Sequence, residues 1–230
     1  MKRSALTRIM NKDIKSIIDN NLSEKGIYVE FNEENMLCAT AMIIGPKDSV
    51  YENGILFFDI DFPPNYPYAP PKITYSSNNK IRIHPNLYVN GKVCLSILNT
   101  WSGPKWSSVM DIAFVLLTMQ SILDNNPLYH EPGYEQSNSK LVKSYNNIVE
   151  YNTLNSLIID RIYNIPEKYI HFIDIINNHL SNIDGYIENK LRNYSDKEDI
   201  DYKDFLYRIN LRISYSKLKE KFENVKQLVY

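Results

Sequence analysis

The sequence has few cysteines and few histidines, and both shortages exclude kinds of site. Only two of its 230 residues are cysteine, Cys38 and Cys94. Two cysteines without a secretory signal are typical of reduced thiols, which predicts a cytoplasmic or nuclear protein. The four histidines are scattered along the chain, so no metal site of the zinc type is expected.

Long apolar runs and net charge are lacking as well, so neither a membrane nor a nucleic acid is an expected partner. The longest purely apolar runs, such as residues 112–117, are far too short to span a bilayer. The N-terminal residues MKRSALTRIM lack the apolar stretch of a signal peptide. The formal net charge of -1 gives no electrostatic preference for nucleic acid or an anionic membrane. The 43% apolar and 23% charged content is ordinary for a soluble globular protein.

The hydrophobic pattern of the first third predicts one helix followed by a small sheet. Apolar residues between 5 and 18 recur at helical spacing, which indicates an amphipathic helix. Short runs of apolar and β-branched residues, separated by turn signals, then predict a four-stranded antiparallel meander. These runs are 27–31, 36–44, 55–62 and 72–75.

A proline-rich segment, FPPNYPYAPPK, follows the third of these runs. Five prolines in nine residues exclude a helix or a central strand. Tyrosines alternate with the prolines, and apolar strands are expected on both sides. We therefore expect an ordered bend with Tyr66 and Tyr68 packed among the rings, and not a disordered linker.

The rest of the chain is predicted to be helical. Residues 107–123 are apolar almost all round, which predicts a buried central helix capped by Ser107 or Ser108. A polar loop follows, and then further helices, the last two starting at Pro166 and about Tyr202. The last helix, to about Leu228, has an apolar stripe that the rest of the protein is expected to cover. That stripe consists of Phe205, Leu206, Ile209, Ile213 and Phe222.

Cys94 lies in the segment HPNLYVNGKVCLSIL, and the residues alone leave its role open. A cysteine protease needs a histidine base within reach of the thiol. Pro85 restricts His84 to an extended or turn conformation, which suits a structural histidine better than a base. The apolar neighbours Val93 and Leu95 are compatible with a buried core thiol.

The same segment resembles the active-site signature of the ubiquitin-conjugating enzymes. In that signature the acceptor cysteine follows the asparagine of a His-Pro-Asn triplet by eight residues, the spacing of Asn86 and Cys94. The stretch IIGPKDSVYENGILFFDIDFPPNYPYAPPKI and the pair Trp106-Ser107 also resemble the family, in family order. NTWSGPK and NNPLYHEPGYEQ are similar to stretches of the class Z enzymes, which are therefore the subfamily that the chain resembles most.

The resemblance implies a fold and a division of the chain. The fold would be the α+β UBC fold, with an N-terminal helix, a four-stranded antiparallel meander, a central buried helix and C-terminal helices. Residues 1–163 would form the conjugating core. Residues 164–230 would form a helical extension packed on that core.

The resemblance also implies a reaction and roles for individual residues. Cys94 would accept ubiquitin or a ubiquitin-like modifier as a thioester and pass it to a substrate lysine or a ligase cysteine. Asn86 would support the oxyanion or the loop, and His84 would brace the turn. Glu131, with His130 beside it, is the nearest match to the family's gate carboxylate. No bound cofactor is implied, because the separate activating enzyme consumes the ATP.

Partner surfaces follow from the resemblance too. Arg8 and Lys12, on the basic face of the first helix, would meet the activating enzyme. Tyr68 and Ser107 would meet a ubiquitin ligase, and protein substrates complete the set of partners. The alternative is a non-catalytic ubiquitin-binding adaptor of the same fold, and Cys94 at the correct spacing argues against it.

Overall fold

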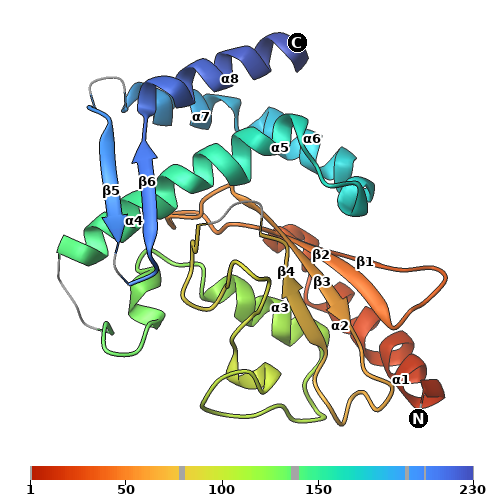
Figure 1. Cartoon of the computed structure of the whole chain (residues 1–230). Coiled ribbons are helices and arrows are strands. Elements are labelled where there is room, and N and C mark those ends of the chain that lie inside the picture. The colour runs from red at the N-terminus through yellow and green to blue at the C-terminus, as the bar shows by residue number, and fades with distance from the viewer. Residues whose placement is uncertain (1, 78–80, 136–139, 195–196, 205, 230) are drawn as a thin grey trace.

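A computed structural model describes residues 2–77, 81–135, 140–194, 197–204 and 206–229. In the view of Figure 1, the sheet β1–β4 lies between the N-terminal helices with α3 on one side and the C-terminal helices on the other. The predicted α+β class is confirmed. Within the described part of the chain, no helix combines the length and the apolar character needed to cross a membrane.

The four predicted strands form one antiparallel meander in the order β1-β2-β3-β4. The predicted second strand begins two residues late, at Cys38, because the preceding residues form a turn. In that turn the Asn32 side chain accepts hydrogen bonds from the backbone N–H groups of Glu34 and Asn35. The strands are β1 (Ile27–Phe31), β2 (Cys38–Ile44), β3 (Ile55–Asp61) and β4 (Lys72–Tyr75).

The N-terminal helix is confirmed as a helical run with a π-helical turn in its middle. It comprises α1 (Lys2–Arg8), η1 (Ile9–Asp13) and α2 (Ile14–Asp19). Ala5 and Ile9 are fully buried, as the apolar spacing predicts. A short η2 (Ser23–Lys25) then leads through Gly26, whose φ of 75° suits glycine, into β1.

The central helix is confirmed, but its predicted cap is wrong. Helix α3 (Ile112–Ser121) begins after Asp111, whose carboxylate accepts a hydrogen bond from Phe114 N at 3.0 Å. Asp111 has extended backbone angles, and its short acceptor suits the exposed N–H groups of a first turn. Ser107 and Ser108 therefore lie outside the helix, in an exposed segment.

The proline-rich bend is ordered, but only one of its tyrosines packs as expected. Tyr66 is buried, and its ring lies 4.9 Å from that of Phe62 and 5.9 Å from that of Trp106. The prediction for Tyr68 is wrong, because 78% of this residue is exposed. Tyr68 comes two residues after Tyr66 and cannot share its pocket.

The segment after the central helix is helical where it was predicted to be. The short η4 (Pro127–His130) precedes a continuous helical run of α4 (Lys140–Asn152), η5 (Thr153–Ile159) and α5 (Asp160–Tyr163). The start of this predicted helix, at about Gln136, lies outside the described residues. Beyond Pro166 follow η6 (Glu167–Phe172), α6 (Ile173–Asn182) and α7 (Asp184–Arg192).

The prediction of one helix from Tyr202 to Leu228 is wrong in its first half. Residues β5 (Ile200–Asp204) and β6 (Ile209–Ile213) form an antiparallel hairpin, and only α8 (Tyr215–Val229) is helical. The residues of β6 alternate, since Ile209 and Ile213 are buried while Asn210 and Arg212 are exposed. A period of two fits a strand, but apolar residues four apart fit a helix equally well, so the spacing alone does not distinguish the two.

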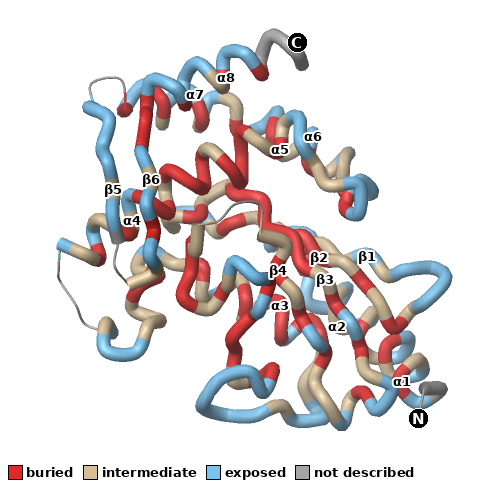
Figure 2. The backbone as a smooth tube through the Cα atoms, viewed as in Figure 1, coloured by how far each residue is buried: buried red, intermediate tan, exposed pale blue. Residues whose placement is uncertain are grey.

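The extension lies against the core, and the predicted apolar stripe is largely covered. Ile209, Ile213 and Phe222 are buried, and Leu206 packs against the core, while Phe205 lies outside the described residues. Lys221 Nζ lies 2.7 Å from Asp160 Oδ1 of α5. Figure 2 shows buried stretches, in red, both in β2 and β3 and in the helical run α4–α5.

Burial of α8 predicts a clear loss of stability when its inner face is truncated. Leu218 is 1% exposed, so Leu218→Ala should lower the free energy of unfolding by about 2–3 kcal/mol through lost burial and the cavity that remains. Urea unfolding followed by circular dichroism measures this change. Lys219→Ala on the exposed face is the control and should change it by less than about 0.5 kcal/mol. Equal stability of the two variants would show that α8 is not docked.

Candidate active site

Backbone and side-chain bonds hold Cys94 against the loop that contains Asn86. Cys94 N donates to Asn86 O at 2.9 Å, and Asn86 Nδ2 donates to Cys94 O at 2.5 Å. The turn between them needs Gly91, which has φ of 88° and whose added Cβ would lie 2.8 Å from Thr74 Cγ2. The chain between Asn86 and Cys94 thus folds back on itself and brings the two residues side by side.

Asn86 spends one hydrogen-bond donor on this contact and leaves its acceptor unused. Its Oδ1 is buried and has no hydrogen-bond partner among the described residues. A side-chain amide has two N–H groups, and the bond to the Cys94 carbonyl needs only one. The geometry therefore suits loop support directly and leaves one N–H for an oxyanion.

His84 has the contacts that a bracing residue requires. Its Nδ1 accepts from Asn86 N at 2.9 Å, which makes Nε2 the protonated nitrogen that donates to Ile122 O, also at 2.9 Å. Complete burial, and to a smaller extent the nearby His130, together lower the pKa of His84 to about 3. Both ring nitrogens are used and the ring is neutral, so His84 cannot serve as the base that a cysteine protease needs.

The buried neutral ring of His84 makes stability depend on pH. An unfolded histidine has a pKa of about 6.5, so between pH 6.5 and 3 the unfolded chain binds the extra proton. The contribution of the buried His84 ring to the free energy of unfolding is therefore complete above pH 6.5 and is lost as the pH falls. We expect the free energy of unfolding to drop by about 2–3 kcal/mol from this group between pH 7 and pH 4.5.

Urea unfolding of the wild type and of His84→Gln at both pH values isolates this contribution. The variant should be less stable at pH 7 and should lose distinctly less stability on acidification. Burial also lowers the pKa of His171 and His179, so these residues contribute to the pH dependence of the wild type as well. The contribution of His84 is therefore the difference between the pH dependences of the wild type and the variant. Parallel pH curves for the two proteins would contradict the assignment.

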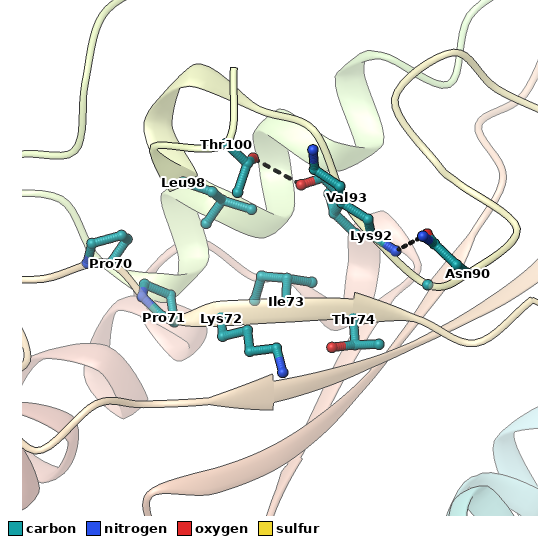
Figure 3. A pocket seen from close by; sticks show the side chains of 11 residues that line it. Pro70, Pro71, Lys72, Ile73, Thr74, Asn90, Lys92, Val93, Leu98 and Thr100 are labelled. Carbon is teal, nitrogen blue, oxygen red and sulfur yellow. Dashed lines mark hydrogen bonds between the residues drawn. The ribbon is translucent and has the colours of Figure 1, made fainter. Parts of the chain in front are cut away.

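Thr100, which sequence reasoning missed, braces the backbone on both sides of Cys94. Its Oγ1 accepts from Leu95 N at 2.9 Å and donates to Val93 O at 2.8 Å. The bond to Val93 is drawn in Figure 3, beside a surface pocket of about 380 Å³ between β4 and this segment. A threonine next to a tryptophan in NTWSGPK gave no signal of this role, because the chain must first turn back through η3 (Ser96–Leu98).

The thiol of Cys94 is less accessible than the reaction implied by the family resemblance requires. Thioester chemistry calls for an exposed thiol, but Cys94 is 1% exposed and is followed by the buried residues Leu95 and Ile97. Cys38 is half-buried, with Sγ 3.7 Å from Asp61 Oδ1. Burial and the Asp61 carboxylate raise the pKa of Cys38, which makes it a poor nucleophile.

The loop after α3 brings one of the two expected gate residues near the His84 loop. The His130 ring lies 5.1 Å from the His84 ring, and its Nε2 is 2.8 Å from Asp124 Oδ2. Burial raises the pKa of Asp124, but hydrogen bonds from His130 and Asn126 N outweigh it and leave that pKa below its usual value. Glu131 instead accepts a hydrogen bond from Tyr207 of the C-terminal hairpin at 2.6 Å.

Comparison with known proteins identifies the family to which the chain belongs. The family model described as "Ubiquitin-conjugating enzyme" matches residues 9–154, which include the sheet, the Asn86 loop and Cys94. The chain belongs to the ubiquitin-conjugating enzyme family. The UBC fold and the resemblance to class Z are thereby confirmed.

Curated relatives place the chain near class Z but are longer than it. Ubiquitin-conjugating enzyme E2 Z of Homo sapiens is 40% identical over 154 residues, which are 66% of this chain and 43% of that protein. The Xenopus tropicalis protein of the same name is 38% identical over 156 residues, 66% of this chain and 49% of that protein. Putative ubiquitin-conjugating enzyme E2 39 of Arabidopsis thaliana is 38% identical over 180 residues, 73% of this chain and 52% of that protein. The chain therefore spans about half the length of these relatives.

Two residues expected to bind the activating enzyme are engaged within this family member itself. Arg8 Nη2 donates to Met110 O at 2.7 Å, and its Nε lies 3.5 Å from the buried Asp13 Oδ2. Lys12 Nζ donates to Val109 O at 2.8 Å. Both cations thus satisfy carbonyl groups just before α3. Binding of the activating enzyme by Arg8 and Lys12 stays a prediction.

Asp13 is the centre of this internal contact. Its Oδ1 accepts from Tyr66 OH at 2.5 Å and from Ile112 N at 2.8 Å. Burial raises the pKa of Asp13, although these two hydrogen bonds and Arg8 oppose the rise. The cluster ties the first helix, the proline-rich bend and the start of α3 together, so its role in this fold is structural.

Two variants distinguish a structural role of the first helix from a role in binding the activating enzyme. Arg8→Ala should lower the free energy of unfolding by about 2–3 kcal/mol, because the buried Asp13 carboxylate loses its cation. Lys15 is exposed, so Lys15→Glu should leave the free energy of unfolding unchanged. It should slow charging, which is the transfer of the modifier from the activating enzyme onto this chain, and it should slow it most at low salt. Urea unfolding and initial charging rates at two salt concentrations measure both effects. Salt-independent charging of Lys15→Glu would remove this helix face as a docking surface.

The two residues expected at the ligase surface are exposed and come from adjacent segments. Tyr68 and Ser107 both reach solvent. Trp106 Nε1 donates to Pro67 O at 2.7 Å, which joins the proline-rich bend to the segment before α3. Ligase binding by Tyr68 and Ser107 stays a prediction.

Proposed function

We propose that the chain is a transferase that carries ubiquitin, or a ubiquitin-like modifier, as a thioester on Cys94. The observation that supports it most is the pair of bonds between Asn86 and Cys94, which holds the cysteine backbone beside a side-chain amide. His84 is neutral and fully bonded, so the site lacks a histidine base in this loop and fits a reaction whose acyl donor is already activated.

Two acyl transfers make up the reaction. In the first, the Cys94 thiolate attacks the thioester carbonyl between the modifier and the activating enzyme. A new C–S bond forms, the old one breaks, and the activating enzyme keeps its thiolate. In the second, an uncharged lysine amine attacks the Cys94 thioester, a C–N bond forms, and the sulfur leaves as the Cys94 thiolate. The amine gives up one proton to a base or to water.

The residues of the site divide this work. Asn86 holds the Cys94 loop with one N–H and offers the other to the oxyanion of the tetrahedral intermediate. His84 and Thr100 fix the backbone on which Asn86 and Cys94 stand. The low exposure of Cys94 means that the segments around it must open before the first transfer.

The partners follow from this chemistry. An activating enzyme consumes ATP to form the first thioester, and no cofactor is needed on this chain. A ligase and a substrate protein receive the modifier at the second step. A non-catalytic ubiquitin-binding adaptor is not favoured, because an adaptor has no use for a cysteine held in this way.

A charging assay with the whole chain tests the proposal. Activating enzyme, ATP and ubiquitin should give an adduct that non-reducing gels show and that thiol reagent removes. The adduct should require ATP and should appear on no other residue than Cys94 when the product is digested and analysed by mass spectrometry. If none of a panel of ubiquitin-like modifiers, each with its own activating enzyme, gives an adduct, the transferase proposal fails and the adaptor takes its place.

A further inference from the structure

The turn of the β5–β6 hairpin contacts both loops of the candidate active site. Tyr207 lies in this turn, between Asp204 and Ile209. Its hydroxyl donates to Glu131 Oε2 at 2.6 Å, and its ring centre lies 4.5 Å from the Arg82 guanidinium carbon. One side chain of the C-terminal extension thus joins the loop after α3 to the loop before Cys94. In Figure 1 the hairpin runs beside α4 toward these loops.

Arg82, which contacts Tyr207, also contacts the His84-Pro85-Asn86 turn. Its guanidinium carbon lies 3.7 Å from the Tyr88 ring centre, and the guanidinium donates a hydrogen bond to the Pro85 carbonyl. The Arg82 carbonyl accepts from Tyr145 OH at 2.7 Å. A guanidinium held over aromatic rings loses rotamer freedom, so Tyr207 helps to fix the carbonyl of the residue just before Asn86.

On the other loop, Tyr207 fixes a carboxylate. Glu131 follows directly after η4, and its neighbour His130 is already held by Asp124. Charged groups in these contacts are Arg82, Glu131, Asp124 and, when protonated, His130. A carboxylate that accepts a short hydrogen bond from a half-buried phenol is restricted to one orientation.

We propose that Tyr207 is a positioning residue for the transfer from Cys94 to a lysine amine. Its hydroxyl orients Glu131, the residue that the resemblance matches to the gate carboxylate, and its ring steadies Arg82 and the turn that carries Asn86. The C-terminal hairpin is then part of the transfer site and not only a cover for the core. This inference rests on the thioester function proposed for Cys94.

A double-mutant cycle on the full chain tests the first half of the proposal. Tyr207→Phe keeps the ring over Arg82 and removes only the bond to Glu131. We expect discharge, the transfer of the modifier from Cys94 to free lysine, to slow by about tenfold or more, the effect of one lost hydrogen bond to a charged group. Charging should be unchanged. Glu131→Gln should slow discharge at least as much, and the double variant should be no slower than Glu131→Gln alone. Tyr163→Phe removes an equivalent hydroxyl–carboxylate bond, to Asp160 at 2.5 Å, and is the matched control.

The pH dependence of discharge separates positioning from a general loss of structure. The side-chain amine of lysine has a pKa of about 10.4, so its uncharged, reactive fraction rises from below about 0.1% near pH 7 to about a tenth at pH 9.5. The defect of Tyr207→Phe should therefore be largest near pH 7 and shrink toward pH 9.5. A defect of the same size at every pH, or rates in the double variant that multiply the two single effects, would overturn the role of Tyr207 on Glu131.

A second measurement needs no modifier at all. Tyr207→Leu removes the ring from Arg82, and we expect iodoacetamide to alkylate Cys94 about tenfold faster in it than in Tyr163→Leu, because the turn beside Cys94 opens more often. Mass spectrometry of the Cys94 peptide gives the rate, with unfolding curves to show that both variants are folded. If the wild type takes up no modifier, the transferase proposal fails while this measurement still decides the loop contact. Equal alkylation rates would overturn it.

Discussion

Cys94→Ser is expected to abolish the thiol-sensitive adduct completely and to replace it, more slowly, with an adduct that thiols do not remove. Serine retains the shape of the side chain but exchanges the sulfur for oxygen. An alkoxide is a poorer leaving group than a thiolate, so the oxyester accumulates instead of passing the modifier on. Non-reducing and reducing gels of the same charging reaction distinguish the two esters.

Cys38→Ser is the natural control, because it makes the same change at the only other cysteine. Cys38 lies on the sheet beside Asp61, where its raised pKa leaves little thiolate. It should charge at the wild-type rate. An equal loss of charging in both folded variants would contradict the assignment of Cys94.

Asn86→Ala is expected to slow discharge to free lysine by about 10²–10³-fold, the usual effect of losing one oxyanion donor. Charging should fall by less than about tenfold, because the Cys94 loop keeps its backbone bond to Asn86 O and its bonds to Thr100. Single-turnover rates of charging and of discharge from purified thioester measure the two steps separately.

Asn90→Ala makes the same truncation on the exposed part of the loop between Asn86 and Cys94, and should leave both steps unchanged. Equal slowing of charging and discharge in Asn86→Ala would assign Asn86 to loop support alone. Unchanged discharge would contradict both roles that the site gives it.

Much of the core could be predicted because its signals are local. The strand runs 27–31 and 72–75 match β1 and β4 residue for residue, since alternation and turn residues mark their ends. The hairpin at β5–β6 was missed because a short alternating run next to a real helix also fits a helical period. The cap of α3 was misplaced because serine and aspartate are equally good caps, and only the backbone path chose Asp111.

By itself the sequence determined the family, the order of the core elements and the eight-residue spacing of Asn86 and Cys94, because these depend on residues close together in the chain. Tertiary structure alone decided that Arg8 binds Met110 O and Asp13, that Cys94 is buried, and that Tyr207 meets Glu131 and Arg82. The partners in these contacts are separated by 102 residues for Arg8 and Met110 and by 76 for Tyr207 and Glu131. Spacing along the chain carries no information about such pairs, because packing of whole helices and hairpins sets which side chains meet.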